Sequence, residues 1–347
     1  MSTKVDIHAE DAVPLEVAPA AGEAQVKARG YWELVWIRFR RDKLALTSVG
    51  FIVFLFFAAY AGAPIAAHFL HHGPNDIFAN GVDPQSLTPV GPWTHISTAP
   101  YPGASGHFPH TLLILGGDSQ LGRDLFLRLL YGARTSIEVA FFATAGSVVL
   151  GVIMGLLAGY FRGWVDTLIS RLIEMVMVFP FLLFIIALRV VAGPYLNSVT
   201  LGFLPRGVFT LALIFTVFGW FYPARIIRGV VLSLREKEFV EAARMTGASD
   251  LRIMRSHLLP HLVAPIIVYS TLIVAQNIIA EAGLSFLGLG IEAPTPSWGT
   301  LLATAPDFYL TQPWLMVWPG LCILLTTLAF NLLGDGLRDA FDPRARV

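Results

Sequence analysis

The stretch EFVEAARMTGASDLRIMRSHLLPHL, residues 238–262, decides the fold, because it is charged and helix-forming in an otherwise apolar chain. Hydrophobic residues make up 55% of the 347 residues and charged residues only 14%, whereas soluble domains carry about 25% charged residues. This deficit indicates that lipid is the main solvent of the chain. The quoted stretch is therefore expected to lie outside the hydrocarbon core, between two groups of membrane spans.

Within this stretch the pattern predicts two short helices. Residues 236–246 form the first, and one of its faces carries Phe239, Ala242, Ala243 and Thr246. Gly247 fits a helix end that needs a left-handed residue. Ser249 or Asp250 then caps a second helix, which is expected to end before Pro260.

Two interpretations of these helices remain open at this point. They could form an ordinary cytoplasmic loop that packs on its own bundle. A connection between two spans needs only a few residues, however. More than about 30 residues with capped helices favours a docking element that enters a groove on a partner.

Six apolar stretches are long enough to cross a membrane, which takes about 20 helical residues. They lack the polar stripe of an amphipathic helix, so six helices of a soluble core are not expected. The spans are predicted near residues 48–70, 136–160, 168–192, 207–228, 262–284 and 314–334.

Positive charge orients the spans. With the N-terminus inside, 19 of the 24 Lys and Arg residues fall on the cytoplasmic side, which places both termini and the 229–261 loop in the cytoplasm. Residues 1–30 do not fit a cleavable signal and are expected to be a flexible cytoplasmic tail. The remaining predicted segments are an interfacial helix at 31–47, a first span at 48–70, an extracytoplasmic loop at 71–135, a core with the other five spans at 136–334 and a cytoplasmic C-terminus at 335–347.

Two of these segments have a predicted internal structure. The interfacial helix joins aromatic side chains to a basic cluster, which suits a helix lying in the inner membrane interface. The extracytoplasmic loop is rich in proline and is expected to be largely irregular until residue 122. There the sequence GRDLFLRLLYGARTS predicts a short amphipathic helix that leads into the second span.

The sequence excludes several kinds of chemistry. It contains no GxxxxGK[ST], HExxH, GxSxG or CxxC pattern, and its one cysteine, Cys322, cannot form an internal disulfide. The 24 basic and 24 acidic residues cancel, so a nucleic-acid partner has no electrostatic support. His68, His71 and His72 could bind a metal, but we favour ordinary polar residues at an interface and assign no catalytic or metal residues.

Five polar residues lie inside predicted spans: Glu174, Gln276, Asn277, Glu281 and Asn331. A carboxylate in lipid is expensive, so these side chains should face protein or water. For Glu174 a local pair with Arg171 is favoured. Gln276, Asn277 and Glu281 are candidates for a translocation path, and for Glu281 interhelical hydrogen bonding is an equal alternative.

Several stretches together resemble a known family. EAARMTGASDLRIMRSHLLP, residues 241–260, resembles the EAA loop of ABC importer permeases. LSFLGLGIEAPTPSWGTLL (284–302), PGLCILLTTLAFNLLGDGLRDAFDPR (319–344) and the 122–136 segment resemble the C-type permease subunit of dipeptide and oligopeptide importers. The chain departs from the family at Gly117, usually Thr, at Ser256, usually Arg, and by one extra residue before Gly122.

The resemblance implies an all-α membrane protein with six transmembrane helices, the type I ABC importer permease (MetI-like) fold and a cytoplasmic coupling helix. The residues that it implies for docking on an ATPase are Phe239, Val240, Glu241, Ala242, Ala243, Arg244, Thr246, Gly247 and Ala248. It further implies a non-catalytic chain of the cytoplasmic (inner) membrane, without a cofactor of its own. ATP and Mg²⁺ would be bound by partner ATPases.

The partners implied are a homologous B-type permease subunit, two ATP-binding subunits and an extracytoplasmic substrate-binding protein. The implied cargo is a di- or oligopeptide, with nickel, glutathione or modified peptides as alternatives. A rival class is a secondary transporter or channel that works alone, which predicts inverted repeats and charges deep in several spans. The sequence contains no evident repeat and few such charges, and an enzyme in the membrane lacks a catalytic constellation.

Overall fold

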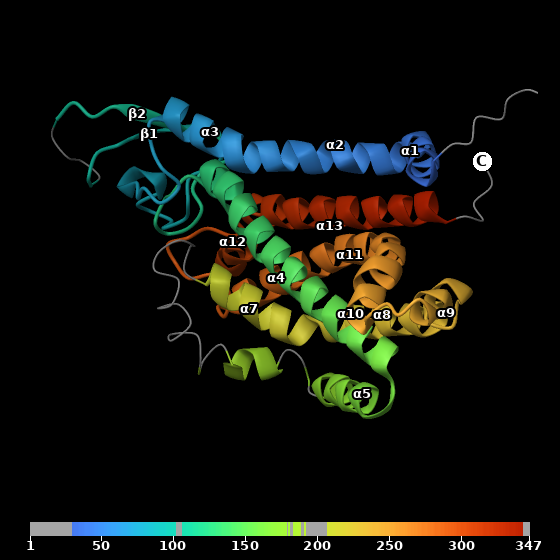
Figure 1. The fold of residues 1–347 in the computed structure, drawn as a ribbon. Helices are drawn as coiled ribbons and strands as arrows, with labels where there is room; N and C mark the ends of the chain where they lie inside the picture. Colours follow the sequence, from blue (N-terminus) through green and yellow to red (C-terminus); the bar gives the residue numbers. More distant parts are fainter. Residues whose placement is uncertain are drawn as a thin grey trace, which may run out of the picture.

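The computed structural model describes residues 30–101, 106–178, 180, 183–188, 191 and 207–342, and most of these are helical (Figure 1). In this part of the chain five helices are long and apolar enough to cross a membrane: Lys43–Leu70, Leu125–Phe161, Val208–Leu234, Asp250–Phe286 and Trp314–Phe341. They correspond to five of the six predicted spans. The remaining one, 168–192, lies partly outside the described residues, as does the predicted tail at 1–30.

The elements follow one another in a simple order. They are α1 (Tyr31–Arg41), α2 (Lys43–Phe57), η1 (Ala58–Gly62), α3 (Ala63–Leu70), η2 (Ala79–Gly81), β1 (Thr94–Ser97), β2 (His110–Leu113), α4 (Leu125–Phe161), α5 (Gly163–Val178), α7 (Val208–Gly219), α8 (Phe221–Leu234), α9 (Glu238–Met245), α10 (Asp250–Arg252), η3 (Ile253–Leu258), α11 (Leu259–Phe286), α12 (Trp298–Thr304), η4 (Ala305–Asp307) and α13 (Trp314–Phe341).

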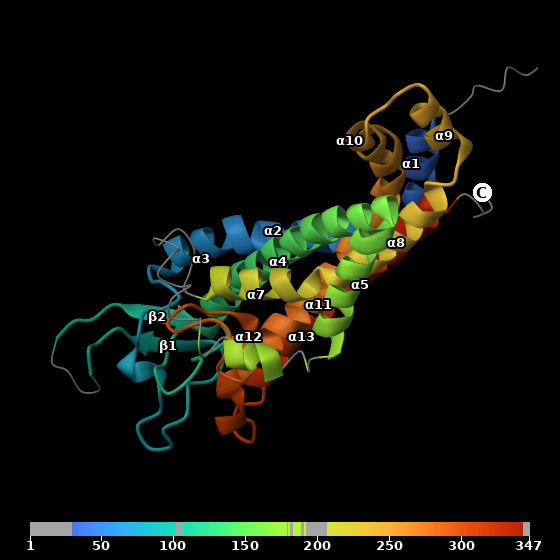
Figure 2. The ribbon, with the colours of Figure 1, turned by 60° about the horizontal axis from the view of Figure 1, so that its bottom comes forward.

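The two ends of the molecule differ in character. Helices α2 and α13 pack side by side, and α4 starts near one end of this pair and runs obliquely away from it along α11, α7 and α8 (Figure 1). One end carries α1, α9 and α10, and the opposite end carries the β1–β2 ribbon and α12, in both ribbon views (Figures 1 and 2). The charged stretch therefore lies at one end of the bundle, as expected from its sequence.

The N-terminal helix ends earlier than the sequence suggested. Helix α1 stops at Arg41 instead of residue 47, because the Asp42 carboxylate accepts hydrogen bonds from the backbone N–H groups of Leu44 and Ala45 and so begins a new helix. The spanning helix therefore starts at Lys43 and not at residue 48. Val35 and Phe39 of α1 pack in a cluster with the C-terminal end of α13.

Helix α4 is one helix of 37 residues, in which the predicted short amphipathic helix continues without a break into the predicted span 136–160. Asp124 caps its first turn. Near its C-terminus Gly151, Gly155 and Gly159 repeat every four residues and face α8. A Cβ atom built at Gly155 would lie 2.6 Å from the Ala224 carbonyl oxygen and 2.8 Å from the Ile227 Cβ atom. The glycines thus let two backbones pack in direct contact, as small residues do between membrane helices.

The second helix of the charged stretch does not end before Pro260, so that prediction was wrong. The chain stays helical from Asp250 to Phe286. Proline cannot donate the i→i−4 hydrogen bond, but here it lies in the first turn of α11, directly after the π-helical turn Ile253–Leu258. In a π-helical turn each N–H bonds to the carbonyl five residues back instead of four. The helix therefore passes Pro260, which has no N–H to donate, and continues as α11.

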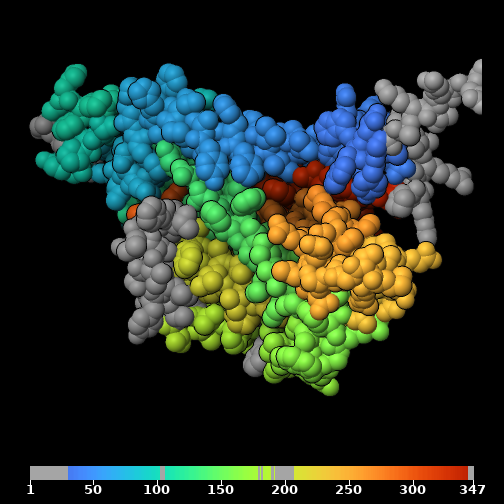
Figure 3. Space-filling model, viewed as in Figure 1, coloured from blue at the N-terminus to red at the C-terminus, as the bar shows by residue number. Residues whose placement is uncertain are grey.

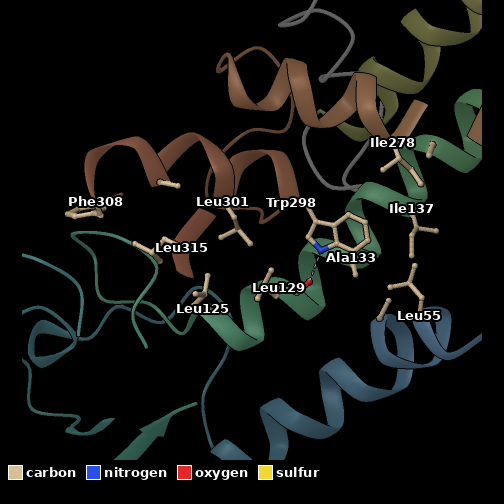
Figure 4. Packing of buried hydrophobic residues seen from close by; sticks show 13 residues of the cluster. Leu55, Leu125, Leu129, Ala133, Ile137, Ile278, Trp298, Leu301, Phe308 and Leu315 are labelled. Atoms are coloured by element: carbon tan, nitrogen blue, oxygen red, sulfur yellow. Dashed lines mark hydrogen bonds between the residues drawn. The ribbon is translucent and has the colours of Figure 1, made fainter. Parts of the chain in front are cut away.

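The core of the bundle gathers around one tryptophan. Trp298 is fully buried, and its indole N–H donates a hydrogen bond to the carbonyl of Leu129, 3.2 Å away (Figure 4). Around it the figure shows apolar side chains from α2, α4, α11, α12 and α13, among them Leu55, Ile137 and Ile278. The start of α12 is thereby fixed against the N-terminal half of α4.

The segment before α4 is more ordered than its proline content suggested. β1 and β2 pair antiparallel, with Thr94 opposite Leu113 and Ser97 opposite His110. The extra residue before Gly122 is accommodated in a closed turn in which the Asp118 N–H donates to the Arg123 carbonyl. The Asp118 carboxylate is buried and pairs with the guanidinium groups of Arg123 and Arg128 at 2.9 Å and 2.7 Å.

The α4–α8 contact generates a prediction. Gly155→Ala should lower the thermal stability of the purified chain, because the new methyl group meets backbone atoms, and overpacking of this kind costs about 1–3 kcal/mol. Gly229→Ala on α8 is the matched control, since a Cβ atom there meets nothing within 4 Å. Thermal unfolding in detergent measures both, and equal melting temperatures for the two variants would contradict the close contact.

Candidate functional site

The charged stretch forms a compact projection, which we call the docking knob and define as residues 238–252. It consists of α9, a turn and α10, and it lies at the end of the molecule that also carries α1 (Figure 2). Gly247 has a φ of +81°, as predicted, and this left-handed residue turns the chain between the two helices. Of the two expected caps, Ser249 occupies the N-cap position of α10.

The two faces of α9 differ in what they contact. Val240 and Ala243, which were expected to face a partner, are buried in a cluster of the chain's own residues that includes Ile227, Ile253 and Leu258. This burial holds the docking knob against the ends of α4, α8 and α11. The outward side is formed by the other predicted docking residues, of which Glu241, Ala242, Arg244, Thr246 and Gly247 are exposed, Phe239 is exposed at its edge and Ala248 is half-buried.

Two apolar side chains of the docking knob were not predicted as contact residues. Met245 is 79% exposed and Leu251 is 71% exposed. Met245 ends α9, and Leu251 lies in the first turn of the helix Asp250–Phe286, where the sequence is still charged. Their position at the tip of each short helix, beside Gly247, is the sequence signal that could have identified them. Both side chains are available for contact with a partner.

A charged hollow lies beside Met245. It encloses about 420 Å³ and is lined by Arg235, Glu236, Glu241, Arg244 and Met245. Figure 3 shows the surrounding segment, in yellow-orange, projecting from the bundle. The arrangement offers an apolar contact next to paired charges of both signs, which suits recognition of a protein surface.

A second, partly open cavity lies between α5, α7, α8 and α11. It encloses about 490 Å³ and is lined by residues of α5, α7, α8 and α11: Val176, Met177, Phe215, Phe218, Gly219, Phe221, Tyr222, Ile273, Gln276, Asn277 and Ala280. Two of the three candidate path residues, Gln276 and Asn277, therefore share one cavity. The Asn277 amide also donates to the Thr144 hydroxyl at 3.0 Å, which ties α11 to α4.

Glu281 lies elsewhere. It is fully buried and accepts hydrogen bonds from the hydroxyl groups of Ser136 on α4, at 2.8 Å, and Ser285 on α11, at 2.6 Å. The Ser136 hydroxyl also accepts from the Trp298 backbone N–H at 3.3 Å. This geometry favours the interhelical hydrogen-bonding interpretation of Glu281, since the carboxylate joins α4, α11 and the start of α12.

The other polar residues inside predicted spans have local environments. Glu174 is exposed and pairs with Arg171 at 2.7 Å, as expected for residues three positions apart on a helix. Asn331 is exposed on α13. Neither residue contributes to the lining of the two cavities described above.

The three histidines do not form a metal site in the part of the chain that the structure describes, where no group of three ligand-type side chains is close enough. His72 is buried, and its ring nitrogens contact the Asp124 carboxylate and the Leu70 carbonyl, each at 2.8 Å. Burial alone would lower the pKa of His72, but these hydrogen bonds and the Asp124 charge outweigh burial and raise it. His72 thus connects the N-cap residue of α4, Asp124, to the end of α3 at Leu70.

Comparisons with known proteins agree with this architecture. The profile of the family described as binding-protein-dependent transport system inner membrane component matches residues 147–347, and that of the N-terminal TM domain of oligopeptide transport permease C matches residues 30–89. The dipeptide transport system permease protein DppC of Alkalihalophilus pseudofirmus is 35% identical over 339 residues, which covers 98% of both chains. The glutathione transport system permease protein GsiD of Escherichia coli is 36% identical and covers 92% of this chain and 93% of its own.

A solved structure shares the fold. An inward-facing structure of the MetNI methionine ABC transporter superposes with a TM-score of 0.51 on 62% of this chain and 96% of its own. At 18% identity this likeness shows the fold alone. Together with the family profile it confirms the predicted type I importer permease, or MetI-like, fold.

The turn of the docking knob generates a prediction. Gly247→Val should misdirect α10, because a β-branched residue at positive φ costs roughly 1–2 kcal/mol. Space is not the obstacle, since a Cβ atom at Gly247 meets nothing within 4 Å. Gly247→Asn is the matched control, because Asn tolerates the left-handed region. Limited proteolysis at 246–250 should be faster in the Val variant only; equal rates for both variants would show that the turn is not under this constraint.

Proposed function

Because the chain belongs to the family of binding-protein-dependent transport system inner membrane components, we propose that it is the permease subunit of an ATP-driven importer of di- and oligopeptides. The chain itself carries out no hydrolysis, since its sequence contains no GxxxxGK[ST] pattern that could hold a nucleotide. Energy then enters through protein contacts. The partners that we propose are a homologous B-type permease subunit, two ATP-binding subunits that hold ATP and Mg²⁺, and an extracytoplasmic substrate-binding protein.

The docking knob is the observation that carries this proposal. Its exposed apolar side chains, Met245 and Leu251, lie in a charged part of the sequence and are available for burial by another protein. The neighbouring Glu241 and Arg244 supply charges of both signs for orientation. When the two ATP-binding subunits close on ATP, their docking grooves move, and the knob moves with them. The helices joined to the knob then tilt and open the path to the other side.

The lining of the cavity between α5, α7, α8 and α11 favours a peptide cargo. Its described lining combines aromatic side chains with the amide groups of Gln276 and Asn277, and none of these lining residues is charged. A side-chain amide can both donate and accept, so it matches the backbone amide groups that all peptides share. A nickel ion would find no carboxylate or imidazole among these residues. The relative that transports glutathione keeps that cargo as the second candidate.

ATPase assays on the purified complex test the proposal. Binding protein loaded with di- or tripeptides should stimulate ATP hydrolysis several-fold, and Ala242→Trp should abolish this stimulation because the indole blocks the exposed small face of α9. Thr47→Trp, at an exposed position on α2 away from the docking knob, is the matched control and should change nothing. Transport by the isolated chain in vesicles would favour a secondary transporter instead, and stronger stimulation by glutathione or nickel would replace the peptide cargo.

The orientation of the chain can be tested separately. We propose that the docking knob and both termini lie in the cytoplasm, because 19 of the 24 Lys and Arg residues fall on that side. A reporter that is active only outside the cytoplasm should work when inserted at Gln85 and fail at Ser249, both of which are exposed. The reverse pattern would place the docking knob outside and end the importer proposal.

A further inference from the structure

Three segments that lead into or form the docking knob meet at one residue, Tyr160, in the last turn of α4. Its side chain is buried, with only 4% of the residue exposed. Its hydroxyl donates a hydrogen bond of 2.6 Å to the Asp250 carboxylate at the start of α10. The Arg244 guanidinium of α9 lies over its ring, 5.4 Å from the ring centre. Its backbone carbonyl accepts a hydrogen bond from Arg235, which follows α8.

This arrangement differs from the general packing of the docking knob. The buried contacts of Val240 and Ala243 are apolar and non-directional, and such contacts allow one surface to slide on another. The contacts of Tyr160 are directional and come from three different segments. A second directional contact is the ion pair between Arg162, which follows α4, and Glu236, which precedes α9. The docking knob is therefore fixed in orientation, and not only in position, relative to α4.

Movement at this end can reach the opposite end through α4. With 37 residues α4 is about 55 Å long. Its glycine-lined face packs directly on α8, so the two helices form one stiff pair. Towards its other end Ser136 bonds Glu281, and Arg128 donates to the Asn75 side chain at 2.9 Å and to the Pro294 carbonyl at 3.3 Å. The helix is thus held by polar contacts at both ends.

We propose that Tyr160 is the positioning residue that transmits rotation of the docking knob to α4, an inference that rests on the proposed function. Its hydroxyl and ring bind no substrate and no nucleotide. They act by keeping α10 and α9 in register with α4, so that a displaced docking knob turns the helix instead of sliding along it. Without this register the ATPases can still dock and hydrolyse ATP, but less of that work reaches the outer end of the path.

Tyr160→Phe tests the proposal, because it removes the hydroxyl and keeps the ring beneath Arg244. In the reconstituted complex we expect the ATPases to stay bound, basal ATP hydrolysis to stay within about twofold of wild type, and peptide transported per ATP hydrolysed to fall several-fold. Asp250→Ala should lower the same ratio, and Asp250→Asn, which keeps an acceptor oxygen, should restore most of it. The double variant Tyr160→Phe with Asp250→Ala should be no worse than either single variant, as expected for one shared hydrogen bond.

Tyr269→Phe on α11 is the matched control, since it removes a tyrosine hydroxyl away from this contact and should leave the ratio unchanged. A melting temperature for Tyr160→Phe close to wild type, together with the lowered ratio, separates transmission from loss of stability. Wild-type transport per ATP in both Tyr160→Phe and Asp250→Ala would overturn the proposal. A wild-type complex that shows no binding-protein-stimulated transport would instead overturn the proposed function itself.

Discussion

The direct contact between α4 and α8 is the constraint on which the rest of the structure depends. At Gly151, Gly155 and Gly159 a side chain on α4 would occupy space that belongs to α8. In lipid the hydrophobic effect does not drive helices together, because lipid tails are as apolar as the helix surfaces. Van der Waals contact between closely packed backbones stabilises their association instead. This contact places the end of α8 beside the end of α4. Only three residues separate the docking knob from α8, so the docking knob packs against both helices.

The sequence could predict the elements whose cause is local. Gly247 has positive φ because a short helix must end and reverse there, and the apolar runs span because their length matches the membrane. Local patterns could not predict outcomes that depend on neighbours. Pro260 should have ended a helix, but a π-helical turn lets the helix continue. Ala243 is small and lies on the expected face, yet that face packs against Ile253 and Leu258, which a helical pattern alone cannot show.

The candidate path shows the same division between local and tertiary causes. Gln276, Asn277 and Glu281 have one sequence signal in common, a polar side chain within an apolar run. In the structure the two amides line a cavity, whereas the carboxylate is enclosed by Ser136 and Ser285. The difference follows from what faces each residue: the amides face a cavity between α5, α7, α8 and α11, while Ser136 of α4 and Ser285 contact Glu281 directly. A buried carboxylate is retained where hydroxyl donors surround it, and an open space is lined by groups that water or cargo can contact.

The length of the two longest helices has a consequence for the lipid around them. α4 and the continuous helix 250–286 each contain 37 residues, so each is about 55 Å long, whereas the hydrocarbon layer is about 30 Å thick. Such helices must either lean or project, and α4 runs at an oblique angle to α2 and α13 (Figure 1). Any tilt that accompanies transport then changes how much of these helices the bilayer covers. A thinner or thicker bilayer would therefore favour one orientation over the other, which makes lipid chain length a determinant of the resting state of this protein.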